Sequence, residues 1–189
     1  MCAIFCAKNG CDRFNFENET CSVATGAVSR NTATFRPKPS GTLREVARNK
    51  TVIAAPYYGP QIPQYANDGN TTSYYHSSNT YMQPWFILDL GTCTPVVQIR
   101  FLPTYESEHY LRFVDTQILL GTAMPASEGD FSKFNVAATM AGPLTSVVQW
   151  QEFELPQPCC ARYVAVYKYV LYSDYHRFLE ISELEVYSP

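Results

Sequence analysis

Apolar and polar residues alternate with a period of two along much of the chain beyond residue 80. These runs are rich in β-branched and aromatic residues, with proline and glycine in the gaps between them, which is typical of strands. No stretch after residue 50 has the length and the 3.6-residue period of an amphipathic helix. We therefore expect an all-β sandwich or barrel of antiparallel strands. The strand-like runs lie at residues 85–90, 96–102, 116–120, 147–153, 162–169 and 181–187.

The first forty residues follow another pattern. Residues 2–9 predict a short helix that places Cys2 and Cys6 on one face. Residues 13–16 and 21–24 alternate like the two strands of a hairpin, and residues 36–42, with two prolines and a glycine, predict a linker. We therefore expect a small module with its linker at residues 1–41, and a β-sandwich over residues 42–189.

Composition excludes several classes of protein. A length of 189 residues fits one domain with a small appendage. Only 16% of residues are charged and 14% are aromatic, including 14 tyrosines, which argues against disorder. The net charge of −3 disfavours a nucleic-acid partner, and no apolar run reaches the 18 residues of a membrane span. Residues 1–50 hold 8 basic and 4 acidic side chains and the rest hold 6 and 13, which supports two parts.

Seven cysteines point to an oxidising compartment. The spacings at the start of the chain do not match the paired cysteines of zinc sites, and no histidine lies near them. Asn18, Asn49 and Asn70 each begin a glycosylation triplet. Together these features favour a secreted, extracellular glycoprotein with disulfide bonds. The first residues lack the basic and apolar regions of a signal peptide, so we expect a mature segment of a longer chain. The cysteines are Cys2, Cys6, Cys11, Cys21, Cys93, Cys159 and Cys160.

Four motifs in order carry a family resemblance. They are Asp-Gly-Asn at 68–70, Trp-Phe-Ile-Leu-Asp-Leu-Gly at 85–91, Ala-Arg-Tyr-Val-Ala-Val at 161–166 and Leu-Glu-Val-Tyr at 184–187. This part of the chain, roughly residues 42–189, resembles the discoidin (coagulation factor five/eight C-type) domain, which is related to the F-type lectins. The resemblance implies a jelly-roll β-sandwich, like the galactose-binding domains, with binding loops at one end.

A second resemblance concerns the first module. The spacing of Cys2, Cys6 and Cys11, followed by Phe14 and Phe16 and then by Cys-x-Val at 21–23, resembles the second half of an apple (PAN) domain. The opening strands of that domain are missing. The resemblance implies disulfides Cys2–Cys21 and Cys6–Cys11, which staple the helix onto the hairpin. A piece of about forty residues buries too little apolar surface to hold itself without such staples.

The three remaining cysteines lie beside predicted strands. Cys93 precedes one strand, and Cys159 and Cys160 precede another. We expect one of the adjacent pair to bond to Cys93. The seventh cysteine is then a buried free thiol, part of a vicinal bond, or a link to a segment outside this chain.

The loop around Asp68 has the ingredients of a calcium site. Calcium takes six to eight oxygen ligands, and Gly69 permits a tight turn that exposes neighbouring carbonyls. In F-type lectins a carboxylate of the C-terminal strand completes the site, and residues 182–186 match that strand. In the alternative, Asp68 caps its own turn and Glu183 binds the loop without metal. The resemblance implies a structural calcium held by the carbonyls of Tyr65, Asn70 and Ser182, the carboxylates of Asp68 and Glu183, and a hydroxyl of Ser77 or Ser78.

Three loops are conspicuous: residues 56–62 hold two adjacent tyrosines between prolines and a glycine, residues 74–76 two tyrosines and a histidine, and residues 105–112 aromatic, histidine and charged side chains. A fourth loop at 172–177 lies either beside them or at the far end. An aromatic ring stacks on the apolar face of a pyranose, while charged groups hold its hydroxyls. These loops therefore predict a sugar-binding site. The candidate ligand-binding residues are Tyr57, Tyr58, Tyr75, His76, Tyr105, Glu108, His109 and Arg112.

Two narrower ligand classes fit less well. Fucose-binding lectins use one histidine and two arginines; Arg112 matches the second arginine, Tyr105 stands at the first, and only His76 lies near the histidine position. Fucose specificity is therefore not predicted. Lipid-binding discoidin domains carry apolar spikes above a basic collar, but residues 51–189 have a net charge of −7, which opposes anionic lipid. We do not expect membrane insertion.

No motif for catalysis is present, neither a nucleophile elbow, nor a phosphate-binding loop, nor a zinc-protease helix. Glu106 and Glu108 are two residues apart on one loop, whereas glycosidase carboxylates flank a bond from opposite sides. We expect a non-catalytic extracellular module that binds a glycan or glycoprotein and neighbouring modules of a longer chain. The alternative is a protein–protein adhesion or matrix module, and a peripheral membrane role comes third.

Overall fold

The computed structural model describes residues 13–17, 20–24, 42–104, 106, 108–144 and 149–189. Strands β1 (Arg13–Glu17) and β2 (Thr20–Ala24) form an antiparallel hairpin, as the sequence predicts. The helix expected at 2–9, the linker, and the pairings Cys2–Cys21 and Cys6–Cys11 involve residues outside the described part. No helix among the described residues is long and apolar enough to cross a bilayer.

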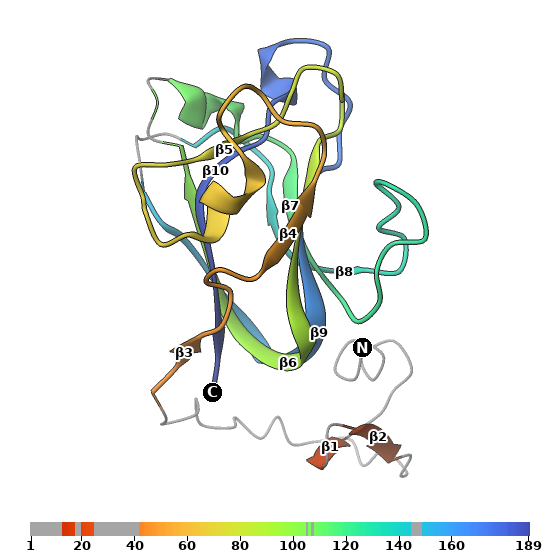
Figure 1. The fold of residues 1–189 in the computed structure, drawn as a ribbon. Helices are drawn as coiled ribbons and strands as arrows, with labels where there is room; N and C mark the ends of the chain where they lie inside the picture. Colours follow the sequence, from red (N-terminus) through yellow and green to blue (C-terminus); the bar gives the residue numbers. More distant parts are fainter. Residues whose placement is uncertain (1–12, 18–19, 25–41, 105, 107, 145–148) are drawn as a thin grey trace.

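The remaining strands form one antiparallel hydrogen-bonded network that folds into a β-sandwich (Figure 1). The strand order is β3-β10-β6-β9-β7-β8, with β4 paired to β6 and β5 paired to β10. In the described part of the chain, short 3₁₀ helices named η1 to η3 lie in the connections. The strands are β3 (Arg44–Glu45), β4 (Thr51–Ala54), β5 (Tyr75–His76), β6 (Trp85–Pro103), β7 (Thr116–Gly121), β8 (Asn135–Met140), β9 (Gln151–Lys168) and β10 (Glu180–Ser188), and the helices are η1 (Pro63–Asn67), η2 (His109–Arg112) and η3 (Tyr175–Arg177).

Two long strands carry the architecture. Strand β6 has 19 residues and β9 has 18, and their pairing shifts register between Asp89 and Thr94 and again between Val96 and Gln98. Gly91, at φ 90°, occupies the first irregularity, a backbone conformation that residues with a Cβ rarely adopt. Because bulges bend a strand, runs expected as separate strands at 85–90 and 96–102 are halves of β6. Strand β9 likewise spans two expected runs.

The main core lies between the folded halves of this network. Phe86 and Leu88 come from the first half of β6, Ile99 and Phe101 from its second half, and all are buried. Full burial of such side chains contributes about 1.5–3 kcal/mol each. The disulfide Cys93–Cys160 joins β6 to β9, and Cys159 is a buried free thiol. This confirms one of the expected arrangements and excludes a vicinal bond.

A second, smaller core lies on the outer face of the same sheet. Along β6 and β7 the residues that alternate with those of the main core point to this outer face, among them Trp85, Ile87 and Leu119. Phe131 and Phe134, from the loop between β7 and β8, cover them. The approach is close: a Cβ on Gly121 would lie 2.7 Å from the Phe134 ring. Figure 1 shows this loop beside β8, at the side of the sandwich.

Candidate functional site

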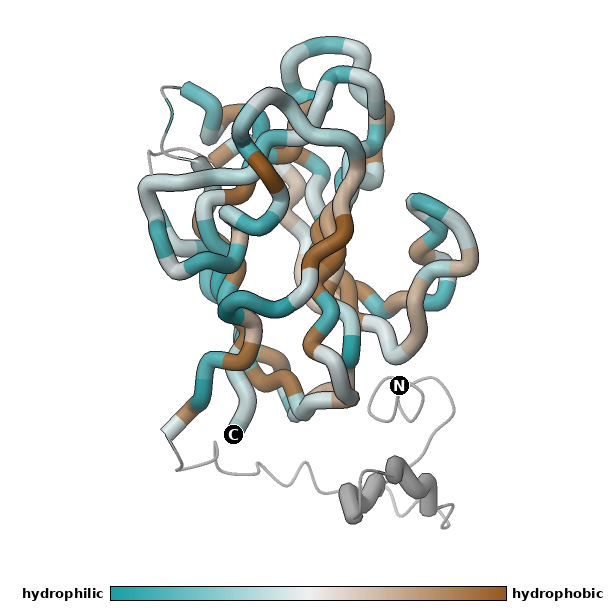
Figure 2. The backbone as a smooth tube through the Cα atoms, in the orientation of Figure 1, coloured by the Kyte–Doolittle hydropathy of each residue, from teal (hydrophilic) through white to brown (hydrophobic). Residues whose placement is uncertain are grey.

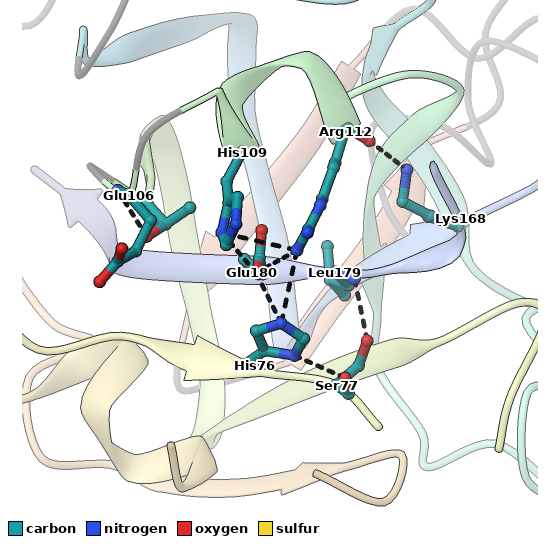
Figure 3. A network of polar contacts seen from close by, with 9 residues as sticks. His76, Ser77, Glu106, His109, Arg112, Lys168, Leu179 and Glu180 are labelled. Atoms are coloured by element: carbon teal, nitrogen blue, oxygen red, sulfur yellow. Dashed lines mark hydrogen bonds and ion pairs between the residues drawn. The ribbon is translucent and has the colours of Figure 1, made fainter. Parts of the chain in front are cut away.

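A buried carboxylate organises the loop end of the sandwich (Figure 3). Glu180, the first residue of β10, is fully buried. Its Oε1 lies 2.7 Å from Arg112 Nη1, 2.7 Å from His76 Nε2 and 3.0 Å from His109 Nδ1. These residues come from β5, η2 and β10, segments far apart in the sequence. We call His76, His109, Arg112 and Glu180 the loop-end cluster.

Local geometry explains why these side chains converge. His76 lies opposite Glu180 in the β5–β10 register. Glu108 adopts a left-handed conformation (φ 58°) and leads the chain into η2. In a 3₁₀ turn residues three apart eclipse, so His109 and Arg112 project on the same side of η2. The Arg112 Nη1 atom also lies 3.4 Å from His76 Nε2 and 3.5 Å from His109 Nδ1.

The orientation of the His76 ring is fixed on its other side. Its Nδ1 atom lies 2.7 Å from the carbonyl oxygen of Ser77. A carbonyl only accepts, so Nδ1 carries the hydrogen and Nε2 is the nitrogen that faces Glu180, an assignment made from the contacts. Ser77 is itself held to the residue that precedes β10, because its Oγ accepts a hydrogen bond of 2.9 Å from the Leu179 amide.

Aromatic rings border the loop-end cluster. The Phe178 ring lies 5.0 Å from the His76 ring and 4.9 Å from the Arg112 guanidinium carbon. The Tyr175 ring lies 5.9 Å from the same carbon, and the Tyr58 ring 5.7 Å from His76. Tyr58 and Tyr175 are exposed. A polar cluster with exposed rings at its edge can hold hydroxyl groups while a ring stacks on an apolar face.

A buried lysine supports the segment that carries Arg112. Lys168 is fully buried, and its Nζ donates to the carbonyls of Arg112 (2.5 Å) and Val114 (3.0 Å). Burial lowers the pKa of Lys168 to about 7, although the charges of Asp115 and Glu180 act in the opposite direction. Asp115 accepts hydrogen bonds from the hydroxyls of two tyrosines of the β9–η3 connection, Tyr169 and Tyr172. The backbone below Arg112 is therefore fixed from two sides.

Of the residues expected to bind ligand, His76, His109 and Arg112 come together, and Tyr58 lies beside them. Tyr57 is exposed and forms a backbone bridge with Ser77, Glu108 is exposed at the start of η2, and Tyr105 lies outside the described residues. The loop at 172–177 lies beside the cluster.

Tyr75 was assigned wrongly as a ligand contact. Its side chain is fully buried, packs against Phe86 with ring centroids 5.6 Å apart, and donates to the carbonyl of Ala55 at 3.3 Å. Tyr75 is therefore a residue of the main core.

Sequence reasoning missed Glu180, Phe178 and Lys168. One signal was available for Glu180: a carboxylate between Leu179 and Ile181, next to an apolar strand, is costly to bury without partners. The expected strand began one residue later, at Ile181, so this charge was left in the loop.

The loop around Asp68 brings two carboxylates to one place. Asp68 accepts from the Asn70 amide (2.7 Å) and the Ser73 hydroxyl (2.9 Å), and Glu183 Oε2 accepts from the Gly69 amide (2.9 Å). Burial raises the pKa of Glu183 to about 7, and the charge of Asp68 adds to this shift. Two carboxylates at one place are the kind of ligand that a hard cation takes, but here both accept backbone amides, as in the expected alternative without metal.

Other features of this loop compete with a cation or lie elsewhere. The Arg48 guanidinium carbon lies 2.5 Å from the position of a Cβ on Gly69, which places a positive charge against the loop. The hydroxyls expected to complete the site have other partners: Ser77 binds Leu179, and Ser78 binds Thr80 at 2.6 Å. Among the described residues around Asp68, no three His, Cys, Asp or Glu side chains gather as metal ligands. The remaining ligands would have to be carbonyls.

No protein-family model matches the chain, and no curated protein matches it in sequence. Several solved structures match it in three-dimensional structure. An F-lectin (fucolectin) from the serum of Morone saxatilis (striped bass) has a TM-score of 0.64 at 20% identity, covering 77% of this chain and 47% of that one. A histidine mutant of the lectin binding domain of lectinolysin, complexed with Lewis b, has a TM-score of 0.62 at 18% identity, covering 77% and 96%.

The family 32 carbohydrate-binding module of C. perfringens NanJ, in complex with galactose, has a TM-score of 0.60 at 17% identity and covers 78% of this chain and 100% of that one. The resemblance of the first module to an apple domain is not supported by these comparisons. At such identities the likeness concerns the fold, and the expected fold is confirmed: the chain forms an all-β sandwich of the galactose-binding-domain type, to which discoidin-like lectins also belong.

Proposed function

We propose that this protein is a non-catalytic recognition module that binds carbohydrate at the loop-end cluster. The observation that carries the proposal is the convergence of His76, His109 and Arg112 on the buried Glu180, beside exposed aromatic rings. The solved structures of similar fold support it, since one is complexed with Lewis b and another with galactose.

Each residue has a role in this proposal. The Tyr58, Tyr175 and Phe178 rings offer surfaces for the apolar face of a pyranose. Arg112, His76 and His109 hydrogen-bond its hydroxyls. Glu180 lies too deep to touch the sugar, and instead holds the three basic side chains in place before the ligand arrives. Such preorganisation reduces the entropy cost of binding.

A structural calcium is part of the proposal. Asp68, Glu183 and the carbonyls of Tyr65, Asn70 and Ser182 would hold it, and the ion would offset the repulsion between two carboxylates and stiffen the loop. The burial of Glu183 beside the charge of Asp68 supports this, whereas the hydrogen bonds from the Asn70 and Gly69 amides to Asp68 and Glu183 are those expected without metal. We also propose an extracellular location, because the Cys93–Cys160 disulfide suits an oxidising compartment. Asn49 and Asn70 are exposed and accessible to glycosylation.

One observation favours a second function, adhesion to a protein partner. Met82 and Leu171 are 53% and 65% exposed, and the 3.5 Å hydrogen bond from the Tyr172 amide to the Met82 carbonyl brings their segments together. Tyr175, which borders the loop-end cluster, follows on the same connection. Exposed aliphatic and aromatic side chains in one region are typical of protein interfaces.

A glycan array tests the main proposal. The protein should bind a defined set of glycans, and Arg112→Ala should weaken that binding at least about tenfold, because a charge-assisted contact of about 1.5–3 kcal/mol is lost. Arg162→Ala is the matched control, since Arg162 forms a surface pair with Asp89. No binding on a broad array, with calcium supplied, would contradict the proposal and leave adhesion as the alternative.

A further inference from the structure

A pocket of about 330 Å³ lies on the side of the sandwich, between the β7–β8 loop and the outer faces of β7, β8 and β9. It lies on another face than the loop-end cluster: Gln117 and Tyr167 line it from the outer face of the sheet, whereas their neighbours Thr116 and Lys168 are fully buried and Lys168 supports Arg112. Figure 2 shows hydrophilic and hydrophobic residues mixed along this loop. The lining residues are Gln117, Leu119, Gly129, Asp130, Phe131, Ser132, Phe134, Val136 and Tyr167.

Aromatic rings form the apolar part of this pocket. Phe131 packs edge-on against Phe134, with centroids 5.3 Å apart, and lies 5.0 Å from the Tyr167 ring. The two phenylalanines are nearly buried in the second core, whereas Tyr167 is half-buried and Val136 is 51% exposed. The rings are therefore fixed from behind, and Tyr167 and Val136 remain accessible to a ligand.

The polar part of the lining consists of an amide, a carboxylate and a hydroxyl, from Gln117, Asp130 and Ser132. The Ser132 amide donates to Asp130 Oδ1 at 3.1 Å, and hydrogen bonds from Ser132 hold the pKa of Asp130 below its usual value. Asp130 is therefore an ionised acceptor at neutral pH, able to receive hydrogen bonds from hydroxyl groups.

A buried donor without an acceptor lies beside the pocket. Trp85 is 4% exposed, and within the described part of the chain its Nε1 atom has no hydrogen-bond partner. A Cβ on Gly129, which lines the pocket, would lie 3.9 Å from that atom. Leaving such a donor unsatisfied costs about 1–3 kcal/mol. Trp85 itself does not line the pocket, so its indole N–H responds to a ligand beside Gly129 rather than binding it directly.

These features restrict the ligand class. The ionised Asp130 repels anions, and a wholly apolar ligand would desolvate Asp130, Gln117 and Ser132 without compensation. A volume of about 330 Å³ is at the lower end of small-molecule pockets. We propose that this pocket is a second carbohydrate site that takes one neutral hexopyranoside unit, stacked against Tyr167 and hydrogen-bonded by Gln117, Asp130 and Ser132.

This inference does not depend on a ligand at the loop-end cluster. Two sites on one module allow it to hold two branches or chains of a glycan at once, and bivalent attachment raises the apparent affinity without any new contact. Each site alone can then be weak, because the second contact is made within one complex.

The side chain of Trp85 provides a direct test. The protein has two tryptophans, so a ¹H–¹⁵N spectrum contains two indole signals, and Trp150→Phe identifies them. Methyl glycosides of galactose, glucose, N-acetylglucosamine and fucose are titrated one at a time, together with methyl glucuronide as the anionic comparison. At least one neutral glycoside should shift the Trp85 indole and the amides of residues 129–136 in a saturable way.

Three variants separate the two sites. Arg112→Ala should leave the Trp85 shift unchanged. Val136→Lys, at the exposed rim, should reduce the affinity of this pocket at least tenfold, whereas Ile53→Lys, on an exposed position of β4 that does not line it, should not. The proposal is overturned if no neutral glycoside shifts Trp85, if the glucuronide binds more tightly, if Val136→Lys binds as wild type does, or if Arg112→Ala abolishes the shift. Shifts confined to His76, His109 and Arg112 would support the loop-end site alone.

Discussion

Replacing Glu180 by glutamine removes the full negative charge that His76, His109 and Arg112 share. The variant keeps the shape of the side chain and one acceptor oxygen. The amide that replaces Oε2 is a donor, placed where the native structure has a buried oxygen without a hydrogen-bond partner in the described residues. The change therefore tests the charge of Glu180 rather than its volume.

The size of the stability loss in Glu180→Gln follows from how deeply Glu180 and its partners are buried. Removing one member of a fully buried ion pair costs about 3–5 kcal/mol. Here the Glu180 side chain is fully buried, but those of His76 and Arg112 keep 13% and 15% of their exposure, so water compensates part of the loss. We expect Glu180→Gln to lower the free energy of unfolding by about 2–4 kcal/mol, out of about 5–15 kcal/mol for a typical domain. In a chain of this length that lowers Tm by about 5–15 °C.

Urea and thermal unfolding, followed by circular dichroism, measure this loss. A double-mutant cycle with Arg112→Met should give a coupling energy above about 1 kcal/mol. Glu152→Gln is the matched control: Glu152 pairs with Arg100 at 3.0 Å, but its side chain is 53% exposed, so it should cost at most about 1 kcal/mol. If Glu180→Gln costs no more than this control, or shows no coupling to Arg112, Glu180 does not organise the cluster.

Three further predictions concern groups that burial perturbs. The pKa of Glu183 is raised to about 7, so the folded state binds the proton more tightly than the unfolded state, and metal-free stability should fall by about 3 kcal/mol as pH rises from 4.5 through 7. Glu183→Gln should flatten this slope. Calcium at pH 8 should raise Tm, and no rise would be evidence against the ion. The pKa of Lys168 is lowered to about 7, so stability should rise with pH between 7 and the pKa of lysine in the unfolded chain, near 10.5. Lys168→Met should remove that rise, and it should weaken glycan binding about tenfold because the Arg112 carbonyl loses its partner. If this variant keeps the pH dependence, Lys168 is not its cause. Burial raises the pKa of the Cys159 thiol, so peptide mapping should find it alkylated only after unfolding, and rapid labelling of the native protein would contradict its burial.

More of the fold than of the site could be predicted, because a strand can be recognised from a short stretch of sequence. The runs at 162–169 and 181–187 are rich in β-branched and aromatic residues because both faces of β9 and much of β10 are buried, and each run can be recognised alone. Strand β5 could not be recognised in this way. It has only two residues, and its extended form is determined by pairing with β10 rather than by its own propensity.

The cluster itself depends on contacts between distant segments. Glu180 is acceptable in a buried position only because Arg112, 68 residues before it, and two histidines reach the same oxygen atom. No window of sequence contains these partners. The role of Lys168 could not be predicted for a similar reason. Its acceptors are backbone carbonyls, which every residue has, so no residue type in the sequence indicates them.

The one correct and one wrong assignment in β5 have a single cause. Successive residues of a strand face opposite sides, so if His76 faces the loop-end cluster, Tyr75 must face the core. The register repeats this across the pair, with Glu180 opposite His76 and Ile181 opposite Tyr75. A slip of one residue would bury His76 and expose Tyr75, exchanging core and site. The packing of Tyr75 against Phe86 therefore fixes the position of His76 as firmly as Glu180 does. The pairing of β5 with β10 thus decides which of the two neighbouring residues, Tyr75 or His76, faces the core and which faces the binding site. The sequence of β5 alone does not distinguish them.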